Sequence, residues 1–83
     1  MKVYIEVTDW YKRFTGGKRS MEIEVVVGAK ALEAVLHTGI PRDEVGFITL
    51  DNGSQEGQCK LVNEDTILSE GDRLKVYPLL VGG

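Results

Sequence analysis

The chain has 83 residues with ten basic and thirteen acidic side chains, so its net charge is −3. A chain of this length builds one domain around one small core. The acidic balance argues against binding to nucleic acid, because nucleic-acid-binding domains carry a basic footprint. The single cysteine, Cys59, leaves no partner for an internal disulfide and no set of thiolates for a metal cluster.

The first residues indicate a strand rather than a targeting segment. Val3, Ile5 and Val7 alternate with more polar positions, which is typical of a strand with one buried face. The segment lacks the continuous apolar stretch of a signal peptide, and no run in the chain approaches the roughly 18 apolar residues of a membrane span. We therefore expect a cytoplasmic protein that makes no contact with a membrane.

Alternation predicts a second strand at 20–27, and Gly16-Gly17 is a turn signal between the two strands. The connection at 9–19 contains three aromatic residues, Trp10, Tyr11 and Phe14. We favour a lid over one end of the core for this connection, and a patch that binds a partner is the alternative. Its four basic side chains predict a solvated positive face that is available to an acidic partner.

One helix is predicted at 28–38. Apolar residues recur at helical spacing at four positions, Ala31, Leu32, Val35 and Leu36. Gly28 is an acceptable N-cap, Gly39 is typical of the left-handed residue after a helix, and Pro41 prevents continuation. His37, the only histidine, has no Cys, Asp or Glu spaced around it as a metal or nucleophile site requires, so we expect no catalytic role for it.

The second half of the chain predicts three more strands. A third strand is expected at 45–50, a short one at 59–62, and the last at 73–77. With one helix and four or five strands, the economical α+β solution packs the helix across one face of a mixed sheet. We expect the last strand in the sheet centre beside the first, with 78–83 as a flexible, projecting tail.

The tail carries the most specific signal in the chain. After Pro78 come three apolar residues, Leu79, Leu80 and Val81, and then Gly82-Gly83. Glycine has no Cβ, so two terminal glycines make a thin thread that carries a free carboxylate into close contact with another surface. Such a thread suits insertion into the active site of another protein. A frayed terminus is the alternative interpretation.

The order of elements, together with this ending, resembles the ubiquitin-like β-grasp fold. More narrowly it resembles the small sulfur carriers, which include the molybdopterin-synthase small subunit and the thiamine-pathway sulfur carrier. The similarity covers the whole chain. Its most telling part is the run Thr66-Ile67-Leu68-Ser69-Glu70-Gly71-Asp72-Arg73-Leu74-Lys75-Val76-Tyr77-Pro78 followed by Gly82-Gly83. In those carriers a leucine, a Gly-Asp turn, a strand, a proline and a terminal Gly-Gly recur in that order.

The resemblance implies a carrier rather than an enzyme, although such a chain can be the small subunit of a sulfur-transferring synthase. It implies that an ATP-dependent activating enzyme adenylates the carboxylate of Gly83, and that sulfur from a persulfide donor replaces AMP to leave a thiocarboxylate. Gly82 is the slim neighbour. ATP and magnesium belong to the activating enzyme, and we expect no cofactor or metal on the carrier. Contacts to the activating enzyme and to a sulfur-accepting synthase are expected from Tyr77, Leu79, Leu80 and Val81.

Two other functions are compatible with the residues. A ubiquitin-like protein modifier would use the same tail to form an isopeptide bond with a lysine, and a passive interaction module would leave the tail inert. The product that receives the sulfur also stays open, between molybdenum or tungsten cofactor, thiamine, cysteine and thiolated tRNA.

Overall fold

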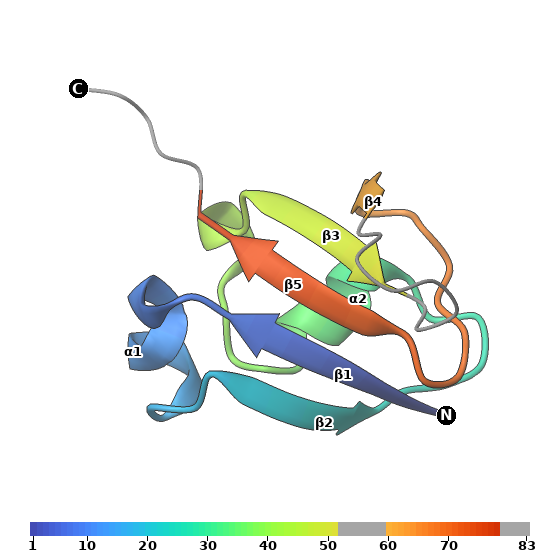
Figure 1. Ribbon diagram of the computed structural model, residues 1–83, viewed down its shortest axis with the longest axis horizontal. Helices are drawn as coiled ribbons and strands as arrows, with labels where there is room; N and C mark the ends of the chain where they lie inside the picture. The colour runs from blue at the N-terminus through green and yellow to red at the C-terminus, as the bar shows by residue number, and fades with distance from the viewer. Residues whose placement is uncertain (52–59, 79–83) are drawn as a thin grey trace.

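The computed structural model describes residues 1–51 and 60–78, and these form one five-stranded sheet with a helix across one face (Figure 1). The strands, in chain order, are β1 (Lys2–Val7), β2 (Ser20–Glu24), β3 (Phe47–Asp51), β4 (Lys60–Val62) and β5 (Arg73–Tyr77). Their order in the sheet is β2-β1-β5-β3-β4. Only the β1–β5 pair is parallel, so the sheet is mixed as predicted.

Strand β5 occupies the centre of the sheet and has the bounds that alternation predicted. It pairs with β1 on one side, where Ile5 lies opposite Leu74, and with β3 on the other, where Ile48 lies opposite Val76. The last strand therefore lies beside the first, as expected. A strand that is paired along both edges leaves no backbone donors or acceptors open on its flanks.

The core lies between the sheet and helix α2 (Ala31–Leu36). Every second residue of the central strands faces the helix and is buried, and the helix contributes small or branched residues to the same core. The buried set includes Val3, Ile5, Val7, Ile48, Leu74, Val76, Ala31, Ala34 and Val35. Two alanines on the buried side let the short helix lie close to the sheet, which compensates for its few turns.

Two predicted boundaries at the entry to α2 were wrong. Strand β2 ends at Glu24 instead of residue 27, and the helix begins at Ala31 with Lys30, not Gly28, as its N-cap. Gly28 lies in a turn and has a positive φ of 91°. Helical residues have a negative φ, so Gly28 cannot belong to the helix. Lys30 forms an isolated antiparallel bridge with Ile67, so the chain is extended where helix was expected. Ile67 lies 37 residues from Lys30 along the chain, so the sequence around Lys30 gives no sign of this pairing.

The helix α2 ends at Leu36 instead of residue 38, but the glycine turn that follows it was predicted correctly. Gly39 has a φ of 100°, in the region where glycine is favoured, and Ile40 turns back into the core. A Cβ at Gly39 would lie 2.5 Å from the backbone oxygen of Phe14, so this turn passes directly against the connection 9–19. The sequence indicated the turn but not this close approach.

The connection 9–19 is helical and closes one end of the core. It contains the short helix η1 (Asp9–Tyr11) and α1 (Lys12–Thr15). Tyr11 is fully buried and Phe14 packs against the core, which confirms the lid. Trp10 is 46% exposed and does not belong to the buried core.

The third strand begins at Phe47, two residues later than predicted, because the helix η2 (Arg42–Glu44) precedes it. The short strand begins at Lys60. Cys59, the first residue of the predicted short strand, lies outside the described residues. Within residues 1–51 and 60–78, no helix has both the length and the apolar composition that a membrane crossing requires.

Candidate functional site at the end of strand β5

The backbone pairing of β5 stops at Tyr77, and this point fixes where the tail leaves the sheet. The Gly46 N–H donates to the Tyr77 carbonyl over 3.0 Å, which closes the last hydrogen bond of the strand. Pro78 follows and has no N–H to continue the ladder. The predicted functional residues Leu79, Leu80, Val81, Gly82 and Gly83 lie outside the described residues. Tyr77 is the one predicted contact residue that the structure places.

Tyr77 lies half-buried on the sheet face opposite α2. Its pairing partner on the neighbouring strand β3 is Phe47, which is 48% exposed. On its own strand the ammonium of Lys75 lies 5.5 Å from the centre of the Tyr77 ring. The same ammonium pairs with the Glu6 carboxylate of β1 at 3.2 Å, and this hydrogen bond raises the pKa of Lys75. Lys75 is therefore a fixed positive charge at neutral pH, beside the base of the tail.

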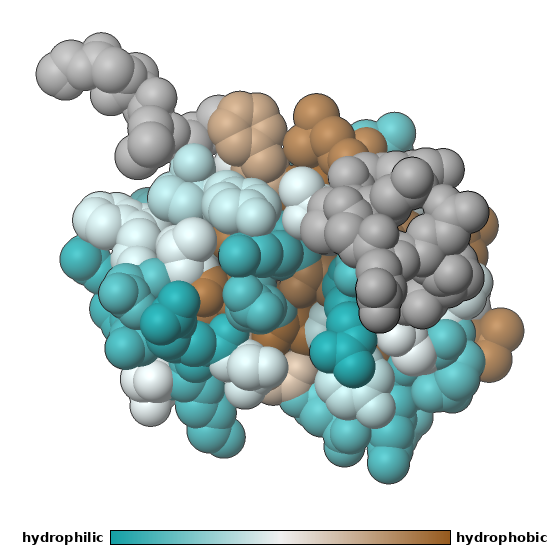
Figure 2. Space-filling model, viewed as in Figure 1, coloured by the Kyte–Doolittle hydropathy of each residue, from teal (hydrophilic) through white to brown (hydrophobic). Residues whose placement is uncertain are grey.

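Phe47 is a surface residue of this site that the sequence reasoning missed. The third strand does not alternate cleanly in sequence, so its pattern did not assign Phe47 to a face, and the register of β3 against β5 brings it to Tyr77. Leu61 of β4, 69% exposed, pairs with Thr49 on the same face. Figure 2 views this face, where hydrophobic side chains gather along the edge toward β3 and β4 and hydrophilic ones cover β1 and β2.

Tyr11 connects the lid to the segment that precedes β3. Its hydroxyl donates to the Glu44 carbonyl over 2.6 Å, which ties η1 to the segment just before β3. Burial raises the pKa of the Tyr11 phenol, and a backbone hydrogen bond at Gly46 opposes the shift. Gly46 also binds Tyr77, so the lid, the start of β3 and the end of β5 are linked through a few backbone groups.

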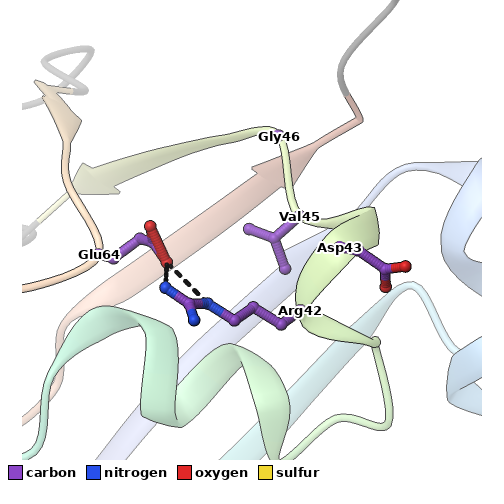
Figure 3. A pocket seen from close by; sticks show the side chains of 5 residues that line it. All are labelled: Arg42, Asp43, Val45, Gly46 and Glu64. Atoms are coloured by element: carbon purple, nitrogen blue, oxygen red, sulfur yellow. Dashed lines mark hydrogen bonds and ion pairs between the residues drawn. The ribbon is translucent and has the colours of Figure 1, made fainter.

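A hollow of about 470 Å³ opens beside Gly46 and is lined by Arg42, Asp43, Val45, Gly46 and Glu64 (Figure 3). The Arg42 guanidinium binds the Glu64 carboxylate at 3.3 Å across it. Both groups are mostly solvent-exposed, and no described group of three or more His, Cys, Asp or Glu could hold a metal here or elsewhere.

Comparison with solved structures finds the same fold over the whole chain. SAMP1 from Haloferax volcanii matches with a TM-score of 0.67 and 18% identity, over 100% of both chains. A putative molybdopterin converting factor, subunit 1, from Pyrococcus furiosus matches with a TM-score of 0.68 and 19% identity, over 96% of this chain and 99% of that one. A chain of the BexX/CysO complex from Amycolatopsis orientalis matches with a TM-score of 0.61 and 21% identity, over 98% and 99%.

These similarities confirm the ubiquitin-like β-grasp fold that the sequence predicted. No protein-family model and no curated protein sequence matches the chain.

Proposed function

We propose that the chain belongs to the ubiquitin-like sulfur carrier family and carries sulfur on its C-terminal carboxylate. One observation supports this most strongly. The sequence Pro78 to Gly83 follows directly on the end of the central strand, at a surface that includes Tyr77 and Phe47. The P. furiosus neighbour, whose name describes a molybdopterin converting factor subunit, shares this fold over nearly its whole length.

In the proposed reaction an activating enzyme performs the chemistry and the chain supplies the reacting group. The Gly83 carboxylate, fully ionised near neutral pH, attacks the α-phosphorus of ATP and displaces pyrophosphate. The terminal sulfur of a persulfide then attacks the acyl carbon, and AMP leaves. A thiol reduces the resulting acyl disulfide and releases the thiocarboxylate. Magnesium and ATP belong to the partner, and a synthase then accepts the sulfur.

The parts of this chain have separate roles in that scheme. Gly82 lets the tail pass through a narrow channel, because it has no Cβ. The apolar residues Leu79, Leu80 and Val81 together with Tyr77 contact the partner. The strand β5, paired on both edges, anchors the tail while the partner handles it. The use of ATP makes the cytoplasm the expected location.

Deletion of Gly82-Gly83 tests the proposal. We expect the truncated chain to keep its circular dichroism spectrum and melting temperature, since both residues follow the last strand in the sequence, and to lose all ATP–pyrophosphate exchange with the activating enzyme. A bulky residue in place of Gly82 should have the same effect, whereas a conservative change at Leu79 should only weaken exchange. Exchange that continues with the truncated chain would overturn the proposal.

A protein modifier is the second candidate, and the similarity to H. volcanii small archaeal modifier protein 1 favours it. Both functions begin with the same adenylate and differ in the acceptor. A thiocarboxylate replaces one oxygen of the intact chain with sulfur, whereas a modifier loses water when it joins a lysine amine. Intact-mass spectrometry detects the first product, and immunoblots for larger conjugates detect the second.

A further inference from the structure

Positive charge is concentrated in one segment of an acidic chain. The connection 9–19 has four basic side chains and one acidic, a net charge of +3, which leaves −6 for the remainder of a chain whose total is −3. This segment follows β1 directly, and Val7 at the end of β1 lies opposite Val76 of β5. Helix α1 therefore lies at the end of the sheet where the tail departs (Figure 1).

The charges of this segment are unequally neutralised. Asp9 binds both Lys12 and Arg19, each at 3.4 Å. Arg13 and Lys18 form no ion pair with any residue of the described ranges. They leave two positive groups available to a ligand.

Arg13 is held in position by an exposed aromatic ring. Its guanidinium carbon lies 4.2 Å from the centre of the Trp10 ring, and Trp10 is 46% exposed. A cation–π contact of this kind restrains the guanidinium, and the N–H groups that point away from the ring can bind a carboxylate. An arginine that is already ordered loses less entropy on binding.

The segment is also a rigid platform. Tyr11 is buried and bonded to the Glu44 carbonyl, and its ring packs against Phe14 with 6.5 Å between centres. The Thr15 hydroxyl donates to the Lys18 carbonyl over 2.6 Å, which fixes the turn that carries the second cation. Both free cations are therefore attached to ordered backbone.

We propose that Trp10, Arg13 and Lys18, the basic edge, bind an acidic segment of the protein that acts on the tail. The identity of that protein as the activating enzyme rests on the proposed function. Carboxylates pair with Arg13 and Lys18, and an apolar side chain of the partner covers the exposed indole face. A nucleic acid is disfavoured, because the rest of the chain carries a net charge of −6 and repels an extended phosphate backbone.

Trp10 is the only tryptophan, so its fluorescence reports directly on the edge. The probe is a decaglutamate peptide added to the full chain, followed by Trp10 fluorescence and by ¹H–¹⁵N chemical shifts. Arg13→Gln with Lys18→Gln removes two charges from the edge. Lys2→Gln with Lys30→Gln is the matched control, because it removes two charges from residues outside the edge, which pair with Glu22 and Asp65.

We expect shifts confined to residues 9–19 and about tenfold weaker peptide binding by the edge variant, since two charge pairs are lost. The control variant, with Lys2→Gln and Lys30→Gln, should change the affinity for the peptide less than about twofold. Salt at about 1 M should abolish peptide binding. Equal weakening by both variants would mean attraction by bulk charge and would overturn the proposal. Tighter binding of oligothymidylate than of the peptide, at equal charge, would also overturn the proposal. A fluorescence change on dilution alone would overturn it too, because it would indicate that a second copy of the chain occupies the edge.

The same variants separate this inference from the proposed function. With the activating enzyme, the edge variant should raise the apparent KM for the chain about tenfold at unchanged kcat, whereas deletion of Gly82-Gly83 should abolish exchange. Trp10→Ala should raise KM and leave kcat unchanged. If the tail is required and the edge variant has a normal KM, docking at the edge is wrong and the carrier function stands. If the truncated chain still exchanges, the carrier function fails whatever the peptide result.

Discussion

Gly39 combines a positive φ with a close backbone neighbour, so a side chain there is costly for two reasons. Its φ of 100° strains any residue with a Cβ, and that Cβ would lie 2.5 Å from the Phe14 backbone oxygen. We expect Gly39→Ala to lower the free energy of unfolding by about 3 kcal/mol, from backbone strain plus overpacking. Gly28→Ala is the control, because Gly28 has a similar φ of 91° and no neighbour within 4 Å. It should cost only about 1 kcal/mol. Urea denaturation measures both, and equal losses would show that the contact with Phe14 is unimportant.

Tyr11 stabilises the lid through one buried hydroxyl. Tyr11→Phe leaves the ring in place but removes the 2.6 Å hydrogen bond to the Glu44 carbonyl. The loss should be about 1–2 kcal/mol, because the carbonyl also loses a partner in a partly buried setting. Tyr4→Phe removes the same atom from a half-buried ring that has the guanidinium carbon of Arg73 5.1 Å from its centre, and it should cost less than about 0.5 kcal/mol. Thermal unfolding of the two variants would contradict this role for Tyr11 if their losses were the same.

At the scale of elements, local pattern predicted those strands whose partners agree with it. The alternation of Leu74 and Val76 gave β5 its bounds, because both neighbours of β5 impose the same period of two. The start of α2 failed for the opposite reason. Lys30 is held extended by Ile67, and Ala31 donates its N–H to the Thr66 carbonyl, so a distant segment overrides the helical spacing.

The candidate site divides in the same way. Tyr77 was predicted as a contact residue together with the apolar residues of the tail, and its place at the end of the last strand follows from sequence order alone. Phe47 required the register of β3 against β5, and the bond from Gly46 to Tyr77 required the whole sheet. Residues brought together by non-local pairing have no short-range signal, and most of the surface around the tail is of this kind.

The pairing of β1 with β5 predicts how stability depends on pH. The Glu6 hydrogen bond raises the pKa of Lys75, and burial raises the pKa of Tyr11, so both groups hold their protons more tightly in the folded chain. Their contributions to stability are complete below the ordinary pKa values of about 10 and are lost as pH rises through the raised values.

The free energy of unfolding from urea titrations should therefore fall between about pH 9 and pH 11. Tyr11→Phe removes one of the two groups and should flatten this decline. A decline in Tyr11→Phe that is as steep as in the unmodified chain would show that Tyr11 does not contribute to the alkaline loss.

At the scale of the whole molecule, the tail is attached to the strand that is hardest to open. Strands β1 and β5 are paired on both edges, and Val3, Ile5, Leu74 and Val76 on them are buried. Strand β4 has three residues and lies at the edge of the sheet. A partner that pulls or threads the tail thus acts on the centre of the fold, and the edge strands need not respond.

Hydrogen exchange tests this arrangement. Amides of β1 and β5 that donate within the sheet should exchange about a hundredfold or more slowly than those of β4, because opening them requires global unfolding whereas an edge strand frays locally. Deletion of Gly82-Gly83 should leave the pattern unchanged, since the anchor is the pairing of β5 and not the tail. If β5 exchanged as fast as β4, the strand would open locally, and a tail on it would yield to the partner instead of presenting the Gly83 carboxylate from a fixed base.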